Sequence, residues 1–168
     1  LRFFWAELLN DNLQKYDRAA EEYTKVLLWD VAKLEKAEKD AEGKPKVKPG
    51  KWMVNAAYNA ILAYDEVVKR DADKIKVETV TDINKKLTIP PQKKALLDAC
   101  ERYVKYVPGG EKKVEIAFKA AKIYYDYNYL EEAVKRFTQI AFDYPDYKFE
   151  DGGRAGEIAY NLVLDSYN

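Results

Sequence analysis

The chain has 168 residues, of which 48% are hydrophobic, and its 29 basic and 29 acidic side chains give a formal net charge of zero. Such mixed charge offers no polyanion-binding surface, so we expect no nucleic-acid partner. No apolar run approaches the roughly 20 residues that cross a bilayer, so we expect no transmembrane span. The chain begins at Leu1 without Met, so an export signal or a lipid tether could precede it.

Apolar residues recur at spacings of three and four along most of the chain, which predicts an all-α fold. In chain order we expect seven antiparallel helices, or three and a half helical hairpins. Their expected ranges are 1–13, 16–40, 52–70, 91–107, 111–127, 130–144 and 154–168.

Two insertions interrupt this series. Residues 42–51 form a basic segment punctuated by Pro and Gly, which we interpret as a solvated connector; the alternative is a docking loop for an acidic partner. Residues 71–91 are longer, and the weak alternation from Lys74 to Val80 predicts a short extended segment or hairpin arm. An ordered loop packed over the helices is the simpler interpretation, although long insertions are often functional.

The hairpin expected at residues 111–145 carries the most specific pattern. Asn128 follows its first helix at a position that suits positive φ, and Pro145 stops its second helix. Its small and aromatic residues are Ala117, Ala120, Ala121, Tyr124, Leu130, Ala133, Phe137 and Ile140. The alanines predict a close helix crossing. In these positions the segment resembles the 34-residue tetratricopeptide repeat (TPR), which implies a TPR-like α-solenoid, an array of stacked helical hairpins.

The resemblance extends more weakly to the rest of the chain, as one TPR-like superhelical domain over residues 1–168. Its repeat-like units are expected at 1–40, 52–107, 111–145 and, incomplete, 154–168. Two segments are similar to those of bacterial cell-envelope TPR proteins and lipoproteins, of the Tol-Pal-associated or outer-membrane assembly type. They are the Tyr-Pro ending of the hairpin, Phe142 to Asp146, and the second-helix segment Ala133 to Phe137. This resemblance implies a periplasmic or outer-membrane-associated protein; a cytoplasmic one is the alternative.

Residues for catalysis are scarce. The chain has no His, which removes the commonest general base and metal ligand and excludes Ser-His-Asp and Cys-His sites. Cys100, the single cysteine, is expected to be a small core residue. The acidic loop from Asp143 to Asp151 matches no calcium-loop spacing. We therefore expect no enzymatic activity, no cofactor and no metal site.

Fourteen tyrosines exceed the needs of packing, and the TPR alignment places several aromatic residues on the first helix of each hairpin, facing the concave groove. Ala57, Ala117 and Ala159 are taken as equivalent positions, and the stripe follows them at spacings of four and three. The predicted partner-binding residues are Tyr58, Leu62, Phe118, Lys122, Tyr125, Tyr160 and Leu164. The same spacing also fits a helix core, so groove and core both stay open.

The last helix is apolar nearly all round, with Ala159 and Leu162 on one face and Tyr160 and Tyr167 on another. This pattern predicts a fragment of a longer repeat protein, or an oligomer of stacked repeats. The functional hypothesis is a non-catalytic scaffold that binds a protein or peptide. The alternatives are a structural subunit with broad surface contacts and an accessory domain of a larger enzyme.

Overall fold

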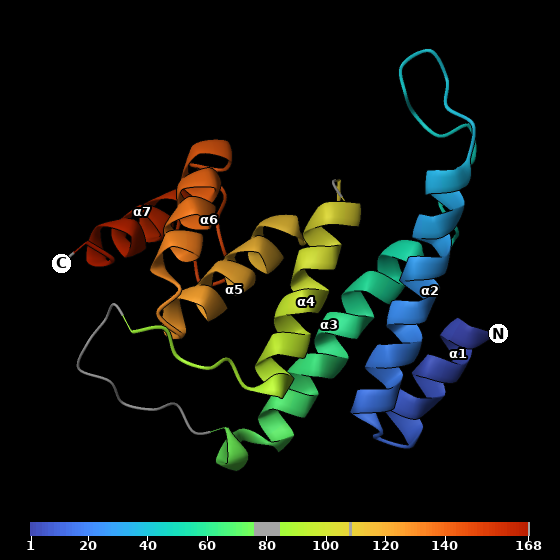
Figure 1. Ribbon diagram of the computed structural model, residues 1–168, viewed down its shortest axis with the longest axis horizontal. Coiled ribbons are helices and arrows are strands. Elements are labelled where there is room, and N and C mark those ends of the chain that lie inside the picture. The colour runs from blue at the N-terminus through green and yellow to red at the C-terminus, as the bar shows by residue number, and fades with distance from the viewer. Residues whose placement is uncertain (76–84, 108, 168) are drawn as a thin grey trace. The chain divides into compact units, whose positions relative to one another are not determined.

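The computed structural model describes residues 1–75, 85–107 and 109–167. In this part of the chain every regular element is a helix, apart from two isolated β-bridges, and an α-helix forms at each of the seven predicted places (Figure 1). The α-helices are α1 (Arg2–Glu7), α2 (Tyr16–Lys36), α3 (Met53–Arg70), α4 (Pro91–Tyr106), α5 (Lys113–Asp126), α6 (Leu130–Asp143) and α7 (Ala155–Asp165). A π-helical turn, Leu8–Asn12, continues α1, and a short 3₁₀ helix, Ala72–Lys74, follows α3.

Contacts divide the chain into two compact units, where the sequence predicts one superhelical domain. The N-terminal unit is Leu1–Asp71 and the C-terminal unit is Ala72–Asn168. The boundary falls at the start of the second predicted insertion, within the expected repeat-like unit 52–107. Each unit has its own core and is described by itself.

In the N-terminal unit, α2 packs against both α1 and α3 (Figure 1). Small side chains make this close packing possible, because they let helix backbones approach one another. The buried cluster combines six alanines with three larger side chains: Ala6, Ala19, Ala20, Ala56, Ala60, Ala63, Phe3, Leu9 and Tyr23.

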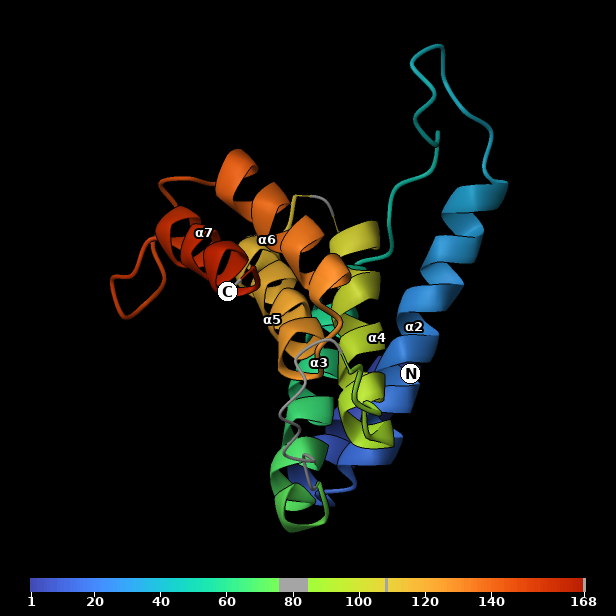
Figure 2. The ribbon, with the colours of Figure 1, turned by 60° about the vertical axis from the view of Figure 1, so that its left-hand side comes forward.

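Helix α2 ends at Lys36, earlier than the predicted end at residue 40. The reason is a turn centred on Asp40, whose carboxylate accepts hydrogen bonds from the backbone N–H groups of Glu42 (3.0 Å) and Lys44 (2.8 Å). Gly43 has a φ of 79° at this turn, which suits glycine. The chain therefore reverses instead of continuing the helix, and this loop extends past the end of α2 (Figures 1 and 2).

In the C-terminal unit, consecutive helices pack in chain order, α4 on α5, α5 on α6 and α6 on α7. Ala121 and Ala133 are fully buried in one cluster with Phe137, as expected for small residues at a helix crossing. Cys100 of α4 is buried, as predicted. The core of this unit lies around Phe137.

The turn between α5 and α6 confirms the prediction for Asn128, which has a φ of 59°. This turn also holds the end of the second insertion. The Asn128 side chain donates to the Lys85 carbonyl (3.1 Å), and the N–H of Leu87 donates to the Tyr127 carbonyl (3.0 Å). Leu87 is buried, so this part of the insertion is an ordered segment packed over the helices. The predicted extended segment, Lys74 to Val80, falls mostly on residues 76–84, which lie outside the described residues.

The acidic loop between α6 and α7 folds back onto α5. The Tyr147 hydroxyl donates to Glu115 (2.9 Å), and the Phe149 ring lies 5.1 Å from that of Phe118. A β-bridge between Lys148 and Arg154 closes the loop before α7 begins. The loop therefore covers part of the α5 face that the TPR pattern assigns to the groove.

Gly156, near the start of α7, allows this helix to lie against the loop. A Cβ atom built on Gly156 would lie 2.7 Å from the Pro145 carbonyl oxygen and 2.8 Å from the Pro145 Cα. Both atoms belong to the backbone and cannot rotate away, so Gly156→Ala is expected to destabilise the fold by about 1–3 kcal/mol. Denaturant unfolding measures this, with Glu157→Ala as the matched control at an exposed neighbour, expected within about 0.5 kcal/mol of wild type. Equal unfolding midpoints for all three proteins would contradict a tight contact here.

Candidate binding site

The predicted partner-binding stripe divides into packed and exposed residues. On α3, Tyr58 is half-buried and Leu62 is exposed. On α5, Phe118 and Tyr125 pack against the core cluster, and their rings lie 5.2 and 6.3 Å from that of Phe137. Both α5 aromatics therefore contribute to the core of the C-terminal unit.

Lys122, between them in the stripe, makes local contacts. It forms an ion pair with Asp126, one helical turn later, and its ammonium lies 5.4 Å from the centre of the Tyr125 ring. This arrangement stabilises a half-exposed helix surface by small amounts.

Tyr160 and Leu164 of α7 are exposed, with 58% and 45% of their surfaces accessible. They lie away from the face of α7 that buries Ala155 and Ala159. Five of the seven predicted residues lie in the C-terminal unit: Phe118 and Tyr125 pack inside, Lys122 is partly exposed, and Tyr160 and Leu164 face solvent. Within this unit, the packed and the exposed residues of the stripe therefore do not form one open surface.

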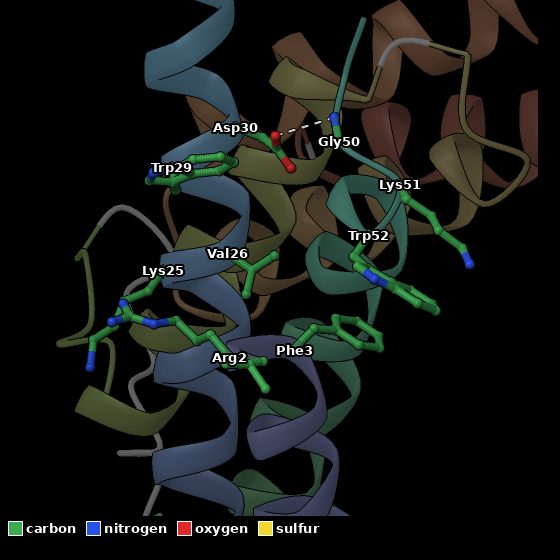
Figure 3. Close-up of a pocket in the computed structure, with 10 residues that line it drawn as sticks. Arg2, Phe3, Lys25, Val26, Trp29, Asp30, Gly50, Lys51 and Trp52 are labelled. Carbon is green, nitrogen blue, oxygen red and sulfur yellow. Dashed lines mark hydrogen bonds between the residues drawn. The ribbon is translucent and has the colours of Figure 1, made fainter.

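A cavity of about 550 Å³ lies in the N-terminal unit instead, between the start of α1, the middle of α2 and the segment that enters α3 (Figure 3). Its size falls within the roughly 300–1,000 Å³ typical of ligand pockets. It is lined by Leu1, Arg2, Phe3, Lys25, Val26, Trp29, Asp30, Gly50, Lys51 and Trp52.

Stacked aromatic rings form one wall of the cavity. Phe3 and Trp52 stack with centroids 4.6 Å apart and ring planes 14° apart, and Phe4 meets Trp52 edge-on at 5.4 Å. Phe3 also contacts the buried Tyr23 at 5.5 Å. Phe3 and Trp52 are held in place because Phe3 belongs to the core cluster of this unit and Trp52 packs against it. Trp29, on α2, is different: it is 68% exposed.

Asp30 lies at the end of the cavity near Gly50 and is only 3% exposed. One of its carboxylate oxygens accepts a hydrogen bond from the Gly50 N–H at 3.2 Å (Figure 3). Gly50 lies so close to Asp30 that a Cβ there would lie 2.3 Å from a carboxylate oxygen, so a side chain at this position would displace the Asp30 carboxylate. In the described residues, no ion pair includes Asp30.

The cations around the cavity are engaged elsewhere. Arg2 and Lys25 both contact Glu22, at 3.5 and 2.5 Å. Lys51 lies over the Trp52 ring, 4.7 Å from its centre, and points away from Asp30 (Figure 3). The cavity therefore combines a buried acidic group with a weakly basic rim and aromatic walls.

The polar groups of the C-terminal unit form a structural cluster. Arg136 of α6 donates to Glu101 of α4 at 2.7 and 3.0 Å, and its guanidinium lies 4.4 Å from the centre of the Tyr124 ring of α5. Burial raises the pKa of Tyr124 and of Tyr127. A tyrosine with a raised pKa stays protonated at neutral pH, so these hydroxyls are poor general bases. The cluster joins three helices.

Among residues 1–75, 85–107 and 109–167, no three or more Cys, Asp or Glu side chains gather as metal ligands would. Within the same residues, no helix combines the length and apolar character needed to span a bilayer. Comparisons of the chain with protein-family models, curated proteins and solved structures find no match.

Sequence reasoning missed the cavity, although two signals pointed to it. All three tryptophans fall within the first 52 residues, and two of them line the cavity. Asp30 follows Tyr23 and Leu27 at helical spacing, which places a charged residue on the buried face of α2. A carboxylate at a core position is unusual unless it has a partner.

Proposed function

We propose that this chain is a non-catalytic scaffold of TPR-like helical hairpins that binds a protein or peptide through the cavity of the N-terminal unit. The observation that carries the proposal is the pairing of a rigid aromatic wall with the exposed Trp29. Tryptophan is strongly enriched among residues that dominate binding energy. A large exposed indole beside a preformed apolar cavity suits the capture of a peptide side chain.

The TPR-like arrangement is supported by the α5–α6 hairpin, where Ala121, Ala133 and Phe137 are buried at the positions that the repeat pattern requires. The bacterial-envelope setting rests on the sequence resemblance alone. Within this proposal, the seven stripe residues become secondary: Tyr160 and Leu164 are exposed and available for contact, whereas Phe118 and Tyr125 are largely committed to packing.

A structural subunit with broad contacts is the second candidate, favoured by the exposed apolar residues of α1 and α7. Phe4, Trp5 and Leu8 lie on α1 and the turn that follows it, and they are 42–53% exposed. Tyr160 on α7 and Tyr167, just after the end of α7, are 58% and 77% exposed. Such a subunit would bind a folded surface and not a short peptide.

Selection from a displayed random-peptide library on the intact chain tests the proposal. We expect enriched peptides that bind with a change in tryptophan fluorescence, and Trp29→Ala should weaken their binding about tenfold or more. Trp29 is a safe target because its exposed ring adds little to the core. Tyr160→Ala, on α7, is the matched control and should leave affinity unchanged. A library that yields no binder, or binders affected only by Tyr160→Ala, would overturn the proposal.

A further inference from the structure

Asp30 is a buried carboxylate with too few partners. It is 97% buried, yet the described residues give it one hydrogen bond, from the Gly50 N–H at 3.2 Å, and no cation. That distance is at the long limit for an N–H···O bond. Burying a charged carboxylate is costly unless a cation and further hydrogen bonds accompany it. Its second oxygen accepts no hydrogen bond from the described residues and adjoins the cavity (Figure 3).

We propose that Asp30 anchors an arginine side chain of the bound peptide. The inference rests on the proposed function, because it names the chemical group that the cavity recognises. Asp30 and the cavity supply what an arginine needs: an acceptor beside Gly50, and apolar surface from Phe3 and Val26 for the aliphatic stem.

The planar guanidinium suits this site better than other donors. It keeps its charge under all ordinary conditions and presents several N–H donors in a fixed fork, so it can bond to the open carboxylate oxygen and still donate to another acceptor. It also stacks on aromatic rings, and Trp29 leaves much of its ring exposed beside the cavity.

The three basic side chains that line the cavity contact other groups, so Asp30 is available to an incoming cation. Arg2 and Lys25 share the Glu22 carboxylate, and Lys51 lies on the Trp52 ring, so each of the three contacts a group other than Asp30. The same three side chains give the rim a positive charge. We therefore expect a single arginine between apolar residues to bind, whereas a run of basic residues would be repelled by the rim.

The test uses two tripeptides on the intact chain: acetyl-Leu-Arg-Leu-amide and its citrulline analogue, a neutral molecule of nearly the same shape. Nuclear magnetic resonance of the indole N–H groups reports the site, because Trp29 and Trp52 line the cavity and Trp5 does not. We expect the arginine peptide to move the Trp29 and Trp52 signals more than that of Trp5. The citrulline peptide should bind at least about tenfold more weakly, since a hydrogen bond to a charged group is lost.

Asp30→Asn completes the comparison. Asparagine keeps an oxygen for the Gly50 N–H, removes the charge and replaces the second acceptor oxygen with an NH2 donor of the same size, so the variant should keep the wild-type indole spectrum and thermal midpoint. It should bind the arginine peptide at least about tenfold more weakly and the citrulline peptide with unchanged affinity.

Two results would overturn this inference: no movement of the Trp29 and Trp52 signals up to millimolar arginine peptide, or equal binding of the two peptides by the wild-type chain. Neither depends on the folding of a variant. If the library selection still yields peptides whose binding needs Trp29 but not an arginine, the proposed function stands and only the role of Asp30 fails.

Discussion

Phe137→Ala is expected to lower the free energy of unfolding of the C-terminal unit by about 3–5 kcal/mol, the usual cost of removing a core aromatic ring. Phe137 is fully buried, and the rings of Phe118 and Tyr125 lie 5.2 and 6.3 Å from it. Its loss would leave a cavity between α5 and α6 that the alanines at this crossing cannot fill. Because whole domains are stabilised by only about 5–15 kcal/mol, the variant should be close to unfolding.

Phe142→Ala is the matched control for this prediction. Phe142 lies on the same helix, α6, but is 85% exposed, so the same change of residue removes little packing. We expect its free energy of unfolding to stay within about 0.5 kcal/mol of wild type. Denaturant melts followed by circular dichroism measure both variants. Similar losses for Phe137→Ala and Phe142→Ala would contradict the assignment of the core to the α5–α6 interface.

The helices could be predicted from the sequence because each carries an apolar face at helical spacing, and such a face needs no distant contact to be recognised. Asn128 and the Ala121–Ala133 crossing were predictable for the same reason: a short turn and a small residue are local signals. The end of α2 was not predictable from periodicity, because the charged residues after Lys36 are compatible with a solvated helix. The structure ends the helix through the Asp40 turn, where a carboxylate accepts two backbone N–H groups.

The candidate site was harder to predict because it depends on contacts between distant segments. The cavity joins residues near position 3 with others near positions 30 and 50, and no single helix pattern contains all three. Asp30, a charged residue on the buried face of α2, and the tryptophans of the first 52 residues were signals, but neither identifies which segments meet at the cavity. The stripe prediction left groove and core open for a related reason: spacing identifies one face of α5, but the loop after α6 decides what covers that face.

Phe118→Ala tests whether this α5 position is an open groove residue or a core residue. An open groove residue could be truncated with little effect on stability, whereas Phe118 is partly buried between Phe137 and Phe149, at ring distances of 5.2 and 5.1 Å. We expect a loss of about 2–3 kcal/mol in the free energy of unfolding, below the roughly 3–5 kcal/mol of a fully buried aromatic because part of the ring is exposed.

Tyr160→Ala tests the equivalent stripe position on α7, where the ring is 58% exposed. Here the change should stay within about 0.5 kcal/mol of wild type, because a solvent-facing ring gives up little buried area when it is removed. Both variants keep the helical backbone, so the difference between them isolates packing at the two positions. If Phe118→Ala is as mild as Tyr160→Ala, Phe149 does not hold the loop against α5. The first helix of this hairpin would then present an open face, and the stripe residues of α5 would again be candidates for a binding surface.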